Sequence, residues 1–154
     1  MSTAIFVLTD SLIGSITEWQ RALDADGLPL RLPAEASLDE SDTWIAQLRG
    51  KRTSFQYWIT EPRDVISAYP MVQFGHDWKY AIAFPYIRDF AELTASWMAA
   101  AAYARATGGV VFDESVRKVI NPDELVEETQ KIERDAVEAE AEFQEFLRRQ
   151  PLKS

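Results

Sequence analysis

The sequence contains no cysteine and a single histidine, His76. Without cysteine the chain has no disulfide, no thiolate zinc or iron–sulfur site and no cysteine nucleophile. The lone histidine lies outside any HExxH motif or serine–histidine–aspartate arrangement, and one imidazole with scattered carboxylates is not diagnostic of a metal site. We therefore expect no catalytic motif, no metal and no cofactor.

Clustered glycines and excess positive charge are also lacking. Among the six glycines only Gly108 and Gly109 are adjacent, so the backbone cradles that bind phosphates in nucleotide-binding motifs are not indicated. Acidic residues outnumber basic ones by 25 to 16, which gives a net charge of −9. Such a charge repels nucleic acid and anionic membranes and attracts a basic protein partner. The alternative is that it only keeps the protein soluble.

No long hydrophobic run is present. The apolar run Ala4–Leu8 is too short for a signal peptide or a membrane span, and no basic region precedes it. Hydrophobic residues make up 47% of the 154 residues and charged residues 27%, which is ordinary globular composition. With no repeat and no low-complexity linker, we expect one cytoplasmic domain over residues 1–154.

Hydrophobic periodicity and capping signals predict the elements. Ser15 with Glu18, Asp89 with Glu92, and Asn121-Pro122 are typical of helix starts. The expected order is strand 4–8, helix 16–25, strand 28–32, helix 43–49, strand 53–60, helix 62–69, strand 79–87, helix 90–106, strand 110–113, strand 116–120 and a long helix within 121–150.

This order favours an α+β fold, a ferredoxin-like βαββαβ sheet with an added hairpin strand and a long C-terminal helix. Right-handed crossovers would place helices 16–25 and 90–106 on the same side of the sheet. In strand 79–87 large residues alternate with small ones, and we expect the bulky face to meet these helices: Tyr80, Ile82, Phe84 and Tyr86.

The C-terminal helix carries a narrow apolar stripe on an otherwise charged surface. Its members are Leu125, Ile132, Ala136, Ala139, Phe143 and Phe146. Such a stripe can pack on the rest of the domain, or it can pair with a second copy as a homodimer.

The segment 73–78 has the most unusual local composition. It combines Phe74, His76, Asp77 and Trp78 within an expected loop, which is typical of a recognition loop. The alternative is that Phe74 and Trp78 anchor the loop to the core while His76 stays in solvent.

Two carboxylates, Glu61 and Asp64, follow the end of strand 53–60. Sites often occur at strand ends, and a small hydrolase built on Glu61, His76 and Asp77 is one hypothesis. The alternative is that these two acids only begin the short helix that follows them.

Trp58 is the large residue on the face of strand 53–60 opposite Phe55, Tyr57 and Ile59. Either this face is open and Trp58 is an anchor for a partner, or the C-terminal helix covers the face through Ile132, Phe143 and Phe146.

Residues 97–115, WMAAAAYARATGGVVFDES, contain a helix that ends in glycine and enters a strand with an acidic end. This stretch resembles small bacterial immunity-type proteins encoded beside toxins. The resemblance implies a non-enzymatic inhibitor that occludes a basic toxin or effector, and no binding residue follows from it. A homo-oligomeric structural or regulatory module and a small hydrolase remain the alternatives.

Overall fold

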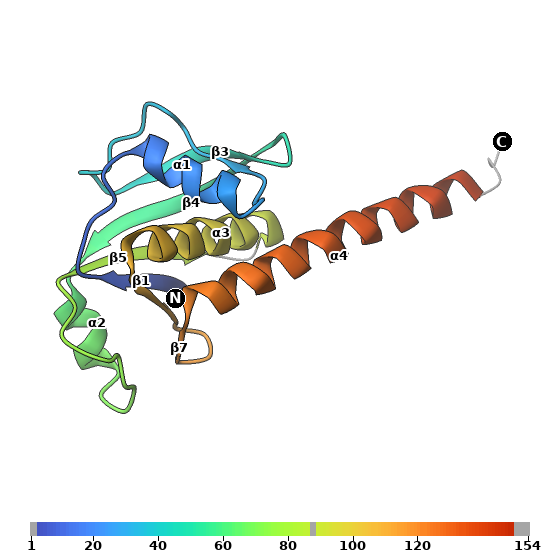
Figure 1. Cartoon of the computed structure of the whole chain (residues 1–154). Helices are drawn as coiled ribbons and strands as arrows, with labels where there is room; N and C mark the ends of the chain where they lie inside the picture. The colour runs from blue at the N-terminus through green and yellow to red at the C-terminus, as the bar shows by residue number, and fades with distance from the viewer. Residues whose placement is uncertain (1–2, 87–88, 150–154) are drawn as a thin grey trace.

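The computed structural model describes residues 3–86 and 89–149 (Figure 1). Within these residues the elements are β1 (Thr3–Thr9), α1 (Ile16–Ala25), β2 (Leu30–Arg31), β3 (Asp42–Leu48), β4 (Lys51–Thr60), α2 (Pro62–Ala68), β5 (Tyr80–Tyr86), α3 (Phe90–Thr107), β6 (Val110–Asp113), β7 (Lys118–Ile120) and α4 (Pro122–Arg149). The fold is α+β, as predicted.

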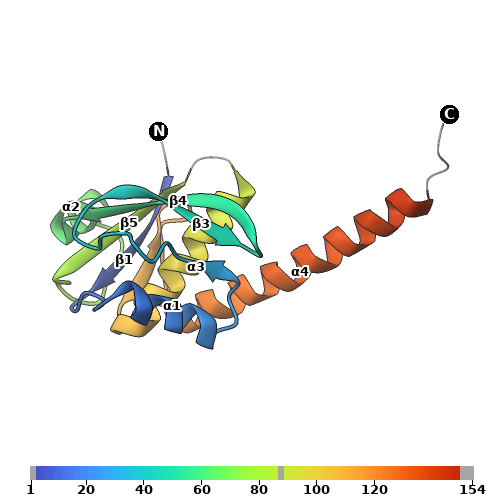
Figure 2. The same cartoon turned by 90° about the horizontal axis from the view of Figure 1, so that it is seen from above.

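The strands form one seven-stranded sheet in the order β2-β3-β4-β5-β1-β6-β7. Each neighbouring pair is antiparallel. β1 lies between β5 and β6, so that Ile5 is opposite both Phe84 and Asp113. We call the sheet side that packs on α1 and α3 the first face (Figure 2), and the opposite side the second face.

Trp19 of α1 lies at the centre of the core on the first face. Ser15 caps this helix by accepting a hydrogen bond from the Glu18 N–H at 3.0 Å, which fixes where the helix begins. The Trp19 indole is fully buried, and its Nε1 donates to the Ala99 carbonyl at 3.0 Å. Its ring contacts the rings of Trp44, Phe55, Tyr57, Phe84 and Tyr103.

The prediction that the bulky face of β5 meets the helices is confirmed in part. Ile82 and Phe84 lie in this same core and Tyr86 packs against it, whereas Tyr80 is 40% exposed. α3 begins at the Asp89 cap, whose carboxylate accepts from the Ala91 N–H at 2.9 Å. It ends at Gly108, which has a left-handed φ of 73°. α1 and α3 pack in the same core, which confirms the prediction that both helices lie on one side of the sheet.

The prediction of a helix over 43–49 is wrong, because this segment is strand β3. Its buried and exposed residues alternate strictly, which is the period of a strand and not of a helix. Arg49 and Gly50 both have positive φ, 52° and 77°, as a two-residue hairpin turn requires. Gly50 therefore turns the chain into β4 and does not end a helix.

Two strands are also shorter than predicted. The strand expected over 28–32 is limited to Leu30–Arg31, and the strand expected over 116–120 is limited to Lys118–Ile120. Pro29 and Pro33 flank β2 closely, and proline cannot donate to a ladder of hydrogen bonds.

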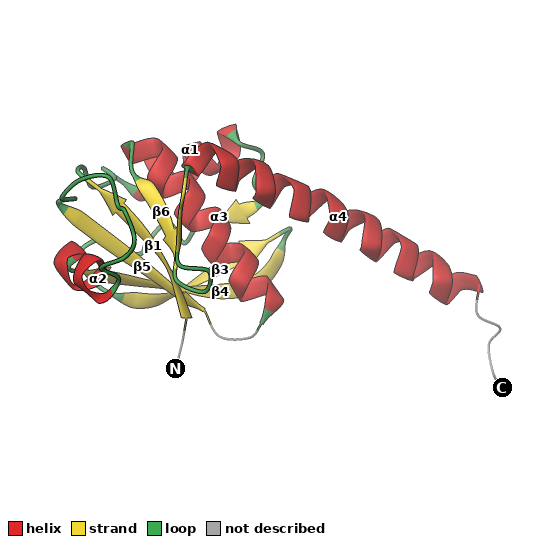
Figure 3. Cartoon of the chain, turned by 90° about the horizontal axis from the view of Figure 1, so that it is seen from below, coloured by secondary structure: helices red, strands yellow, loops and turns green. Residues whose placement is uncertain are grey.

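α4 is partly packed and partly free. Leu125, Val126 and Thr129 are buried, and the Gln130 amide donates to the Asp26 carbonyl at the end of α1 at 2.7 Å. From Val137 onward every described side chain of the helix is exposed. Figures 1 and 3 show this end projecting well beyond the sheet.

Candidate functional site

Part of the second face of the sheet is covered by α2 and by the segment 69–79 that follows it. Val65 and Phe74 pack there on Leu8, Ala81 and Phe112 in a second, smaller core. Phe74 is 6% exposed, and its ring meets that of Phe112 edge to face at 5.0 Å. Phe74 therefore anchors the loop to the sheet, as one of the two alternatives for this segment predicted.

A cavity of about 680 Å³ opens between α2 and the segment 69–79. Its lining includes four of the predicted site residues, Glu61, Asp64, Asp77 and Trp78. Arg63 also lines it, so the lining carries three carboxylates and one guanidinium group and is acidic on balance. We call this cavity the acidic pocket, and Glu61, Asp64 and Asp77 the pocket carboxylates.

The start of α2 leaves the Glu61 carboxylate out of the helix cap. Pro62 occupies the first position of α2, which its fixed φ suits. Glu61 is the N-cap residue, yet its side chain makes no capping hydrogen bond. The cap of this short helix therefore does not use the Glu61 carboxylate.

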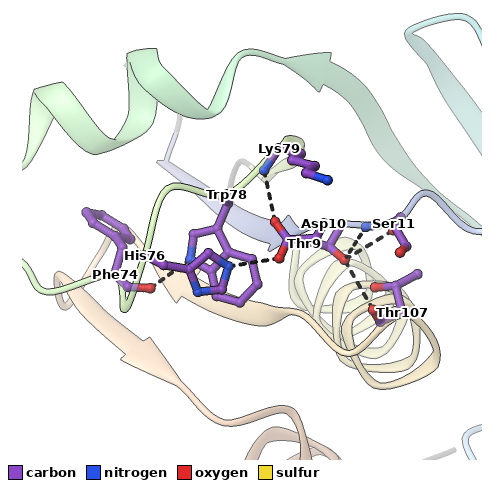
Figure 4. A network of polar contacts seen from close by, with 8 residues as sticks. All are labelled: Thr9, Asp10, Ser11, Phe74, His76, Trp78, Lys79 and Thr107. Atoms are coloured by element: carbon purple, nitrogen blue, oxygen red, sulfur yellow. Dashed lines mark hydrogen bonds and ion pairs between the residues drawn. The ribbon is translucent and has the colours of Figure 1, made fainter.

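One wall of the acidic pocket is held by a small polar network (Figure 4). The Trp78 indole Nε1 donates to the Phe74 carbonyl at 2.7 Å, and the imidazole of His76 lies against the indole with ring centroids 3.8 Å apart. His76 Nε2 is 2.9 Å from Asp10 Oδ2, while Asp10 Oδ1 accepts from the Lys79 N–H at 3.2 Å. His76 thus supports the indole and lies outside the cavity lining.

Asp10 was not predicted, although it directly follows β1 in the sequence. Its two oxygens bind both ends of the segment 76–79. The contact joins residues 66 positions apart, and only the pairing of β1 with β5 brings them together.

Glu114 was also missed, and it fixes the other end of the segment. It accepts a hydrogen bond from the Tyr69 hydroxyl at 2.6 Å and one from the Ala4 N–H at 3.2 Å. The bond to Glu114 raises the pKa of Tyr69, because it favours the protonated phenol. The pocket-forming segment is therefore tied to the sheet at both ends.

Trp58 lies outside the pocket lining and is 42% exposed. Its Nε1 donates to Gln56 Oε1 on the same strand at 2.8 Å. The alternative in which α4 covers this face is wrong, since α4 joins the core on the first face through Leu125 and Val126. Phe143 cannot be assigned to either face because its side chain lies outside the described residues.

The acidic pocket does not have the geometry of a metal centre. Within residues 3–86 and 89–149, no three histidine or carboxylate side chains gather closely enough to hold an ion. Carboxylates spread around a wide cavity suit a larger cation, such as a guanidinium or ammonium group lying over an indole. In the same described part of the chain no helix is long and apolar enough to cross a bilayer.

Comparisons with protein-family models, with curated proteins and with solved structures found no match to this chain.

Proposed function

We propose that this protein is a non-enzymatic protein-binding domain whose acidic pocket accepts a basic side chain of its partner. The observation that carries the proposal is the convergence of the three pocket carboxylates and Trp78 around one cavity. These residues come from α2, its N-cap and the segment that follows it. An arginine or lysine side chain entering there would form ion pairs with the carboxylates and lie against the Trp78 ring.

The charge of the whole chain supports the same partner chemistry. A net charge of −9 speeds the approach of a basic surface and disfavours acidic ones. Within this proposal the protein is an immunity or antitoxin-like inhibitor that occludes the basic cleft of a toxin or effector. The support for that step is the resemblance of residues 97–115 to immunity-type proteins together with the acidic charge.

We also propose that the fold is a ferredoxin-like βαββαβ plan, to which β2, β3, β7 and the C-terminal helix α4 are added. It is supported by the chain order β1, α1, β4, β5, α3, β6 and by the sheet order β4-β5-β1-β6 within the larger sheet. In this plan α1 and α3 are the two crossover helices, and both pack on the first face.

The function is tested by affinity capture with three forms of the full chain. The first is the wild type, and the second is the pocket variant Glu61→Gln/Asp64→Asn/Asp77→Asn. The third is the remote variant Glu35→Gln/Asp39→Asn/Glu40→Gln, in which three exposed acids of the loop before β3 are neutralised. Each variant loses three negative charges, so a difference between them reports where the carboxylates lie and not the net charge of the protein.

We expect the wild type and the remote variant to retain one basic protein from an extract of the native host, and the pocket variant to lose it. The captured protein should lose its own activity when the wild type is added. Equal retention by all three forms contradicts the role of the pocket. Retention without loss of the partner's activity contradicts the inhibitor reading.

A further inference from the structure

The far end of α4 is a helix without a partner in the described chain. α4 has 28 residues and is about 42 Å long at ~1.5 Å per residue. Its residues 137–149, which we call the distal segment, are exposed wherever their side chains are described. Isolated helical segments of this length gain little stability without tertiary packing.

The distal segment continues the stripe that packs the start of α4 onto the core. Positions 125, 129, 132, 136, 139, 143 and 146 recur at alternating spacings of four and three, which is the repeat of a coiled-coil seam. Leu125 and Thr129 are each 1% exposed, whereas Phe146 is 56% and its neighbour Leu147 48% exposed. The seam is therefore buried against the domain at the start of α4, and its described side chains in the distal segment are exposed to solvent.

The charges beside the seam decide which partner and which direction fit it. Glu140 and Glu142 flank the middle of the distal segment, Asp135 lies just before it, and Arg149 ends it. In a parallel pair of two copies, Asp135 of each would lie beside Glu140 of the other, so that like charges meet. In an antiparallel pair, Glu140 and Glu142 meet the same residues of the other copy, but Arg149 of each copy lies beside Asp135 of the other.

From the continuous seam and this charge pattern we infer that the distal segment of α4 pairs antiparallel with the same segment of a second copy. Phe146 of one chain then packs opposite Ala136 of the other, and Leu147 widens the apolar contact. Figure 1 shows the sheet and other helices at the opposite end of α4, so antiparallel pairing keeps the two bodies apart. The acidic pocket takes no part in this contact.

The inference is tested by sedimentation equilibrium of the full chain from micromolar to millimolar concentration. We expect a monomer–dimer equilibrium, and we expect Phe146→Ala to weaken it at least about tenfold, which corresponds to ~1.4 kcal/mol. Arg134→Glu serves as the control, because this exposed residue lies on the helix face opposite the seam. The control should leave the equilibrium unchanged.

The antiparallel direction of the helix pair is tested by charge-reversal substitutions. Arg149→Glu and Asp135→Arg should each weaken self-association, since each places like charges side by side. A mixture of the two variants should form a mixed dimer as tight as the wild type, because both contacts then join opposite charges. Replacing the crowded central acids, as in Glu140→Gln/Glu142→Gln, should tighten the dimer.

A wild-type chain that stays monomeric at millimolar concentration overturns the inference. A dimer that is indifferent to Phe146→Ala also overturns it, and a mixture that fails to restore pairing overturns the antiparallel arrangement. The pocket variant described above should dimerise normally, so failure of the proposed function and failure of this inference are distinguishable.

Discussion

Replacing Trp19 by phenylalanine tests the account of how the first face is held together. The indole has no exposed surface and contacts five other aromatic rings. Phenylalanine keeps a ring at this position and removes both the second ring and the Nε1 donor to Ala99.

The expected loss follows from three contributions. The lost hydrogen bond contributes about 1 kcal/mol. The smaller ring leaves a cavity of roughly 40 Å³, which costs about 1 kcal/mol at ~24 cal/mol per Å³. Weakened contacts with the surrounding rings add about 0.5–1.5 kcal/mol. Together they predict that the free energy of unfolding falls by roughly 3 kcal/mol.

Urea unfolding followed by far-ultraviolet circular dichroism measures this change, with the slope against denaturant unchanged from the wild type. Trp58→Phe is the matched control, because the same substitution at a 42% exposed site should alter stability by less than about 0.5 kcal/mol. A loss at Trp19 no larger than that at Trp58 would refute the central packing role of the indole.

Three further predictions address the rest of the fold. Burial raises the pKa values of Tyr57 and Tyr103 above their ordinary value of 10.0. The stability that these two phenols contribute should therefore be complete below pH 10 and fall as the pH rises further, by about 1.4 kcal/mol per pH unit for each tyrosine until its folded-state pKa is reached; a phenolate absorbance titration in which every tyrosine of the folded protein ionises near pH 10 would contradict this. Gly109→Ala should cost more than about 2 kcal/mol in thermal unfolding, because a Cβ there would lie 2.4 Å from the Leu8 carbonyl oxygen; an unchanged melting temperature would show that β1 and this turn can separate. Asp89→Ala should cost about 1 kcal/mol and Asp89→Asn much less, since asparagine can still cap α3; equal losses in the two variants would rule out the cap.

Elements with strong local signals were predictable from the sequence. The caps at Ser15 and Asp89, the glycine end of α3 and the alternation in β5 each depend on residues close together in the chain. The segment 43–49 was mistaken because Gly50 can end a helix as well as form a hairpin turn. Its alternating burial becomes decisive only once β4 lies beside it.

Part of the lining of the acidic pocket was predictable as separate residues but not as one arrangement. Glu61, Asp64, Asp77 and Trp78 were identified from two separate segments, and only the fold shows that they line one cavity. The roles of Asp10 and Glu114 could not be predicted, because their partners His76 and Tyr69 lie 66 and 45 residues away in the sequence. Trp58 stood out for its unusual face, and the fold places it apart from that cavity.

The most direct test of the acidic pocket is a titration of the isotope-labelled protein with argininamide, followed by amide and indole N–H resonances. If the pocket carboxylates and Trp78 accept a guanidinium group, the Trp78 indole and the amides of Glu61 and residues 63–67 should shift most. The remote variant should behave as the wild type does, and the pocket variant should lose these shifts. Shifts that are spread evenly over the acidic surface, or that persist in the pocket variant, would contradict the account.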